Sequence, residues 1–219
     1  NAIGSLPDSQ SQLGRVNKYT AYALLGKVLL YQDKFNEAAS ALDNVIGVYS
    51  LVSDYGSQFL RFGENGPESV FEIQYSNQSN WYDWGCAHCS EGNYAIIMNG
   101  PRGWSGPEYA QGWSFNVPTA EFYNSFEEGD SRRDATVLDI EAFAAATGSS
   151  YTEGYDHTGY FNNKYIPRAG ESGGQTELNY LTNFRIIRYS DVLLMAAEAY
   201  NRGGIDDGLA QEFLNQVRR

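Results

Sequence analysis

Apolar residues recur every three or four positions between residues 17 and 48, which is the period of helices with one buried face. The pattern breaks once, at the polar pair Asp33 and Lys34. Because such a short polar break joins helices that run in opposite directions, we predict antiparallel helices over residues 17–32 and 35–47. The residues that carry the pattern are Tyr22, Leu25, Gly26, Leu29, Ala38, Leu42 and Val45.

A second helix pair is predicted over residues 189–218. Ser190 or Asp191 can cap its first helix, and Gly203 and Gly204 can end it. In both pairs, small residues stand where the two helices must approach closely, and this spacing follows the tetratricopeptide repeat pattern. The sequence therefore predicts a mostly α fold, in which tetratricopeptide-like helix pairs form the scaffold.

Extended and irregular segments separate the two helix pairs. The segment "ESVFEIQYS" places Phe71 and Ile73 opposite Glu72, which predicts a short extended segment with one buried face. From residue 77 to 116 the chain is rich in Gly, Asn, Ser and aromatic residues and has no sustained period. Long irregular stretches inside a compact unit usually form functional surfaces, so we expect this aromatic loop region to carry the site.

Residues 118–180 combine a short helix with further irregular loops. In "VPTAEFYNSFEEGD", Pro118 and Thr119 can start the helix and Gly129 can end it. In "EEGDSRRDATV", Asp130, Arg132, Arg133 and Asp134 place opposite charges beside a turn, which indicates an ion-paired turn rather than a charged site. We predict that residues 1–219 form a single unit that carries both helix pairs.

Composition narrows the possible partners. The chain has 27 acidic and 15 basic residues and a net charge of −12, which argues against nucleic acid or an anionic membrane as a partner. It holds 17 Tyr, 11 Phe and 4 Trp, and every Trp lies between residues 81 and 113. There is no leader peptide and no long apolar run, and the last helix has no closing cap, so we expect an internal fragment of a longer protein.

Both cysteines lie in the segment "WGCAHC", as Cys86 and Cys89. A thiol-redox site needs a strand before this motif and a helix after it, and neither is indicated here. A structural zinc site needs two ligand pairs, and even with His88 or His157 only one pair has the required spacing. We predict no metal and no cofactor. Two states of the cysteines remain open: a small disulfide or two free thiols. An extracytoplasmic location would favour the disulfide.

The aromatic residues of the loop offer a different chemistry. Sugar rings present apolar C–H faces and polar rims, so a glycan site combines flat side chains with amide, carboxylate or guanidinium groups. The candidate glycan-binding residues are Asn80, Trp81, Tyr82, Asp83, Trp84, Arg102 and Trp104. The alternative is that these rings fill gaps between loops and helices, and we assign Trp113 to that packing role.

The sequence argues against an enzyme. Asp83 and Glu91 form the one pair of carboxylates that we place with the aromatic loop, and a single pair does not define a glycosidase. The chain has no Gly-x-Ser-x-Gly elbow and no phosphate-binding glycine loop. We therefore predict no catalytic residues.

Several segments, in a fixed order along the chain, resemble the SusD/RagB family. The most specific is "RYSDVLLMAAEAYN", which is close to the RYADVLLM-type pattern of that family, with Ser190 where alanine is common. The other segments are "YTAYALLGKVLLYQDKFNEAASALDNVI", "GPESVFEIQYS", "GWSFNVPTAEFYNSFEEGDSRRDATV", "TGYFNNKYIPR" and "FLNQVRR". Together they cover more than half of the chain.

The resemblance implies a glycan-binding lipoprotein on the cell surface of a member of the Bacteroidetes. Its expected function is non-catalytic binding of an oligosaccharide or polysaccharide and delivery to a TonB-dependent, SusC-like transporter in the outer membrane. The resemblance also implies a lipid anchor on the N-terminal part of the protein, and a contribution of early loops to the glycan site. Both parts would lie outside this sequence.

Two alternative functions remain open. The helix pairs could serve a tetratricopeptide-type interaction protein whose ligand is another polypeptide. The cysteines could instead serve an extracytoplasmic thiol-redox protein that uses Cys86 and Cys89.

Overall fold

The computed structural model describes residues 2–78, 84–172 and 178–218. Its contacts divide the chain into two compact units. Unit 1 comprises Asn1–Ser53, Asn65–Gln74 and Phe184–Arg219, and unit 2 comprises Asp54–Glu64 and Tyr75–Asn183. The prediction that residues 1–219 act as one unit stays a prediction.

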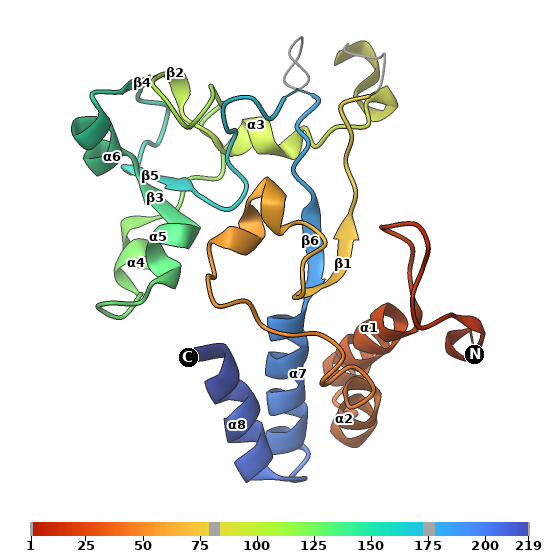
Figure 1. The fold of residues 1–219 in the computed structure, drawn as a ribbon. Helices are drawn as coiled ribbons and strands as arrows, with labels where there is room; N and C mark the ends of the chain where they lie inside the picture. Colours follow the sequence, from red (N-terminus) through yellow and green to blue (C-terminus); the bar gives the residue numbers. More distant parts are fainter. Residues whose placement is uncertain (1, 79–83, 173–177, 219) are drawn as a thin grey trace. The chain divides into compact units, whose positions relative to one another are not determined.

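Unit 1 is built from two helix pairs, as the apolar period predicted. The first pair is α1 (Lys18–Tyr31) and α2 (Phe35–Leu42), and the second is α7 (Tyr189–Arg202) and α8 (Asp207–Arg218) (Figure 1). The mostly α fold class is confirmed. α2 ends at Leu42 instead of Gly47, because the backbone then tightens into turns in which Val45 N–H donates to Leu42 O at 2.8 Å.

Small residues let the helices of unit 1 approach closely. A Cβ placed on Gly26 would lie 2.5 Å from Leu42 Cγ, so the surface of α1 at this point fits directly against α2. The core between the pairs is apolar and fully enclosed. Its buried residues are Ala23, Leu42, Val45, Val70, Ile187, Tyr189, Val192, Leu193, Ala196 and Phe213. The predicted role of small residues in close packing is confirmed.

Two strands complete unit 1. β1 (Ser69–Ile73) pairs antiparallel with β6 (Phe184–Arg188), which runs directly into α7 (Figure 1). The extended segment was predicted correctly, but the buried face was not. Glu72 is 3% exposed, whereas the apolar Ile73 is 41% exposed.

The burial of Glu72 has a physical explanation in its partners. Its two carboxylate oxygens each accept the backbone N–H of Asn65 at 3.2 Å. The Nε atom of Arg185 on β6 lies 3.7 Å from Glu72 Oε1, and both side chains are almost fully enclosed. Hydrogen bonds and an opposite charge offset the cost of removing this carboxylate from water, so a charged residue replaces the expected apolar one.

Unit 2 consists of short elements joined by loops. Two antiparallel pairs of strands, β2–β4 and β3–β5, are its only sheets within the described residues. The helices and strands are α3 (Ala95–Asn99), β2 (Arg102–Ser105), α4 (Ala120–Asn124), α5 (Arg132–Thr136), β3 (Val137–Asp139), α6 (Ile140–Thr147), β4 (Ser150–Thr152) and β5 (Tyr160–Asn162) (Figure 1). The sequence predicted α4 but none of the other helices.

The predicted start of α4 and the predicted ion-paired turn are both present. Thr119 caps α4, since its hydroxyl oxygen accepts the backbone N–H of Phe122 at 3.2 Å. In the turn that follows, Arg132 Nη2 lies 2.6 Å from Asp130 Oδ2. Among the helices of the described residues, none has both the length and the apolar character needed to cross a membrane.

The buried ion pair between Glu72 on β1 and Arg185 on β6 predicts how substitutions at these positions change the stability of unit 1. Replacing Glu72 by Leu removes the carboxylate that faces the enclosed Arg185 guanidinium, and it should lower the free energy of unfolding by about 3–5 kcal/mol. The double variant Glu72→Leu, Arg185→Leu should recover much of that loss, because an apolar pair needs no charge compensation. Urea denaturation of the three proteins measures both effects. A loss in the single variant of less than about 1 kcal/mol would show that the pair is not coupled in this way.

Candidate functional site

The structure describes only part of the predicted glycan site. Asn80, Trp81, Tyr82 and Asp83 lie outside the described residues, and for Trp84 the backbone alone is described, at the start of the 3-10 segment Trp84–Cys89. Arg102 and Trp104 are described in full. They come from β2, two residues apart.

Arg102 and Trp104 point to different surroundings although they share a strand. Gly103 between them has a φ of +58°, a left-handed conformation that interrupts the regular alternation of a strand. A Cβ at this position would lie 2.4 Å from Thr152 Oγ1 on the paired strand β4, so glycine is required here. The structure therefore separates two residues that the sequence analysis placed in one site.

Trp104 packs into a small core of unit 2. Its ring lies 5.7 Å from that of Tyr109 and 5.9 Å from that of Phe143, and its indole N–H donates to Gly106 O at 3.2 Å. Burial raises the pKa of Tyr109 to about 12, with the neighbouring Glu108 carboxylate adding to the effect. These contacts give Trp104 a packing role and leave its assignment to the glycan site a prediction.

Trp113 also packs, as the sequence analysis proposed. Its side chain lies against a second small core, whose buried members are Ile96, Ile97 and Tyr180. This core holds α3 in place beneath the segment 112–116.

The segment 112–116 is bound to the end of α3 by its backbone. Four N–H groups donate to carbonyl oxygens at 2.8–2.9 Å: Gly112 to Pro101, Trp113 to Ile97, Ser114 to Gly100 and Phe115 to Met98. The carbonyls at the end of a helix have no partner inside the helix, so this segment satisfies them. The result is a fixed loop backbone in a region with few regular elements.

Two glycines make this approach possible. A Cβ on Gly112 would lie 2.3 Å from Gly100 Cα, a distance that no side chain tolerates. Ser114 adopts a φ of +58° and Asn116 a φ of +52°, which direct the chain back toward α3. The backbone hydrogen bonds on both sides offset the strain of these conformations.

This loop presents Phe115 and Arg102 together at the surface. Phe115 is 51% exposed, and its ring meets that of Trp113 edge to face at 6.1 Å. The Arg102 Cζ atom lies 5.8 Å from the centre of the Phe115 ring, within the range of a cation–π contact. The pair thus combines an exposed flat ring with an exposed guanidinium group.

Sequence reasoning selected Arg102 but missed Phe115. The segment "GWSFNVPT" was interpreted as packing at Trp113 followed by the start of the next helix. Trp113 does pack, and Thr119 does cap α4, but the exposed ring between them was not recognised. The glycine before Trp113 and the polar Ser114 and Asn116 were the available signals of a sharply turned segment. Which ring of such a segment stays exposed depends on contacts with α3, and these are not visible in the sequence.

The two cysteines are joined in a disulfide, Cys86–Cys89, with their Cα atoms 5.3 Å apart. The backbone is kinked at Cys86, and irregular chain follows from Ser90 to α3. A thiol-redox motif needs a helix whose N-terminus lies at the first cysteine, so this backbone does not support that alternative. Within the described residues, no group of three or more His, Cys, Asp or Glu side chains is arranged to hold a metal ion.

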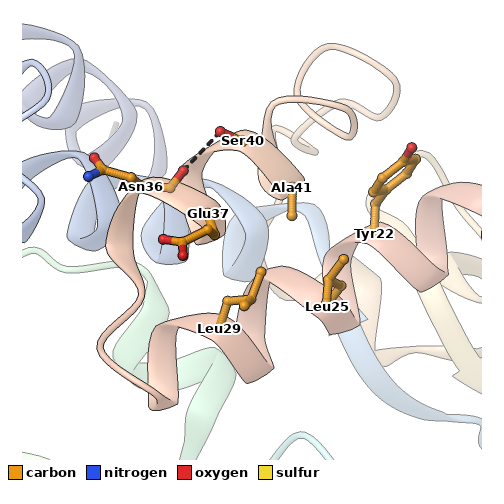
Figure 2. Close-up of a pocket in the computed structure, with 7 residues that line it drawn as sticks. All are labelled: Tyr22, Leu25, Leu29, Asn36, Glu37, Ser40 and Ala41. Atoms are coloured by element: carbon orange, nitrogen blue, oxygen red, sulfur yellow. Dashed lines mark hydrogen bonds between the residues drawn. The ribbon is translucent and has the colours of Figure 1, made fainter. Parts of the chain in front are cut away.

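Unit 1 carries a shallow groove of about 430 Å³ between α1 and α2. Figure 2 shows Leu25 and Leu29 on α1 pointing toward the side chains of α2. The complete lining is Tyr22, Leu25, Leu29, Asn36, Glu37, Ser40 and Ala41. Such an apolar groove could bind a segment of another polypeptide, which is the function of the tetratricopeptide-type alternative.

Comparison with known proteins identifies the family. Residues 67–219 match the profile of the SusD family. A curated relative from Formosa agariphila, "SusD-like protein P2", is 30% identical over 97% of this chain. The chain belongs to the SusD family, so the resemblance noted in the sequence is confirmed.

Solved structures of glycan-binding relatives share the fold. A "Laminarin binding SusD-like protein" is 39% identical, with a TM-score of 0.89 over 99% of this chain and 50% of its own. "Surface glycan-binding protein A from Bacteroides thetaiotaomicron in complex with laminarihexaose" is 32% identical, with a TM-score of 0.88 over 97% of this chain and 49% of its own. The chain thus spans about half the length of these relatives, and 43% of the Formosa agariphila protein. Proteins of the SusD family are non-catalytic glycan-binding proteins.

The contacts of Trp104 lead to a stability prediction. Replacing Trp104 by Ala should lower the free energy of unfolding by about 2 kcal/mol or more, because the ring fills part of a core. Tyr155→Ala is the matched control, since Tyr155 belongs to the same unit and is 93% exposed. Its effect should stay within about 0.5 kcal/mol. Chemical denaturation measures both, and equal stabilities for the two variants would contradict the packing role.

Proposed function

We propose that this chain is part of a longer, non-catalytic surface protein, and that this protein binds a neutral glycan of the laminarin type. The observation that carries the proposal is the likeness of nearly the whole chain, at 32% identity, to a protein solved in complex with laminarihexaose. The relative that is 39% identical is named for laminarin binding, which supports the same ligand class. The net charge of −12 also fits a neutral glycan better than a polyanionic one.

Aromatic stacking and hydroxyl hydrogen bonds would provide the binding energy. We propose that Trp81, Tyr82 and Trp84 stack on sugar rings, while Asn80 and Asp83 bind hydroxyl groups. Arg102 contributes from the described part of the loop region. Each such contact replaces a contact with water, so the affinity of a single site is modest.

Membership of the SusD family supports a proposal for the partner and the location. We propose that the whole protein is held at the cell surface, on the outer membrane, by a lipid anchor on its N-terminal part. It would pass the bound glycan to a TonB-dependent, SusC-like transporter. The proposal is supported by membership of the SusD family.

A second candidate function is the binding of another polypeptide in the α1–α2 groove. Its apolar lining and shallow shape are the observations in its favour. The two candidates use different surfaces, so they can be separated by variants that change only one of them.

Calorimetric titration of the full-length protein with laminarin, laminarihexaose and a panel of other polysaccharides tests the proposal. Wild-type protein should bind laminarin and laminarihexaose, and the double variant Trp81→Ala, Trp84→Ala should lose this binding because two stacking surfaces are removed. Tyr155→Ala, a loss of one exposed ring elsewhere in unit 2, should bind as wild type. Absence of binding to every glycan in the panel would refute the proposed function.

The groove gives an independent prediction. Leu25→Glu places a charge in the apolar lining of the α1–α2 groove and should leave the affinity for laminarihexaose unchanged, because the glycan does not use this surface. The same titration measures the effect. If Leu25→Glu and the double tryptophan variant lost binding equally, without loss of folded structure by circular dichroism, the assignment of the glycan to the aromatic loop would be wrong.

A further inference from the structure

Arg102 is held in one orientation by the loop beneath it. Its backbone N–H donates to Ser114 Oγ at 3.1 Å, and its side-chain Nε donates to Trp113 O at 2.8 Å. The second bond fixes the direction of the Nε–H group, which lies in the guanidinium plane, and so restricts the orientation of the guanidinium. The side chain therefore loses little freedom when a ligand binds.

The outer edge of this guanidinium remains available. Nε donates to Trp113 O, whereas neither Nη nitrogen takes part in a hydrogen bond or ion pair with the part of the chain that the structure describes. Each Nη carries N–H donors in a fixed, planar arrangement. Two adjacent oxygen atoms of a ligand match that arrangement.

Phe115 supplies an apolar surface beside these donors. The residue is half exposed, yet its backbone is tied to Met98 O at 2.8 Å and its ring rests against Trp113. An exposed ring on a fixed backbone is a suitable stacking surface for the C–H face of a sugar. Its distance of 5.8 Å from Arg102 Cζ places ring and donors within the span of one pyranose unit.

We infer that Phe115 and Arg102 form a subsite for one neutral pyranose unit, which stacks on Phe115 and offers two adjacent hydroxyl groups to the Nη nitrogens of Arg102. This inference rests on the proposed glycan-binding function; it adds Phe115 as a stacking residue and gives Arg102 a specific role in binding hydroxyl groups. A carboxylate would also fit the guanidinium. The net charge of −12 disfavours an acidic polysaccharide and so favours the diol.

Titration of the full-length protein with laminarihexaose tests the subsite. Phe115→Ala and Arg102→Ala should each raise the dissociation constant about tenfold, since each removes one of the two recognition groups. Arg102→Lys should weaken binding to a similar extent, because lysine keeps the charge but lacks the planar pair of donors. Phe115→Tyr keeps the ring and should bind as wild type.

The controls separate this inference from the function on which it rests. Tyr155→Ala removes a ring of the same unit that is 93% exposed and lies outside the proposed subsite, and it should not change the affinity. If Phe115→Ala proves unfolded by its thermal transition, Arg102→Lys and Phe115→Leu provide the same test with a smaller loss of side-chain volume. Wild-type affinity in folded Phe115→Ala or Phe115→Leu, together with Arg102→Ala and Arg102→Lys, would overturn the subsite and leave the glycan-binding function intact.

Two further outcomes are decisive. If the wild-type protein binds no glycan, the proposed function fails and the subsite fails with it. If an oligosaccharide of uronic acids binds more tightly than laminarihexaose, and Arg102→Ala abolishes that preference, the subsite is one for carboxylates and the inference of a neutral diol is wrong. Tighter binding of laminarihexaose together with the tenfold losses would support the subsite as described.

Discussion

The contact between Gly100 and Gly112 is the constraint on which the candidate site depends. With no side chain on either residue, the segment 112–116 can lie against the end of α3 and donate its N–H groups to carbonyls that the helix leaves unpaired. That backbone then positions the ring of Phe115 and, through Trp113 O and Ser114 Oγ, the guanidinium of Arg102. A region with few regular elements thus gains a fixed surface without a large core beneath it.

The helical scaffold was predictable because its signals are local. Apolar periodicity, the polar break at Asp33 and the small residue Gly26 depend on neighbours in the sequence, and these located both helix pairs. The buried face of β1 was predicted wrongly because it depends on a residue that is distant in the sequence. Glu72 is inside because Arg185, far away in the sequence, lies beside it on β6. An isolated alternating segment contains no information about such a partner.

The site was only partly predictable from the residues. Residue types identified Arg102, since guanidinium groups suit hydroxyl-rich ligands. They could not show that the left-handed Gly103 sends Trp104 away from it, into a core with Tyr109 and Phe143. They also could not show that Phe115 stays exposed while the neighbouring Trp113 is half-buried, because that difference arises from the way the segment lies on α3.

The glycine pair has a consequence for how recognition can change over evolutionary time. The backbone frame beneath the loop is fixed by glycines and main-chain hydrogen bonds, whereas positions 102 and 115 contribute exposed side chains. Sequence drift can therefore alter the side chains at these two positions while the carrier loop keeps its shape. Different sugar preferences can then arise by exchanging surface groups on the same backbone frame, without a new fold for each ligand.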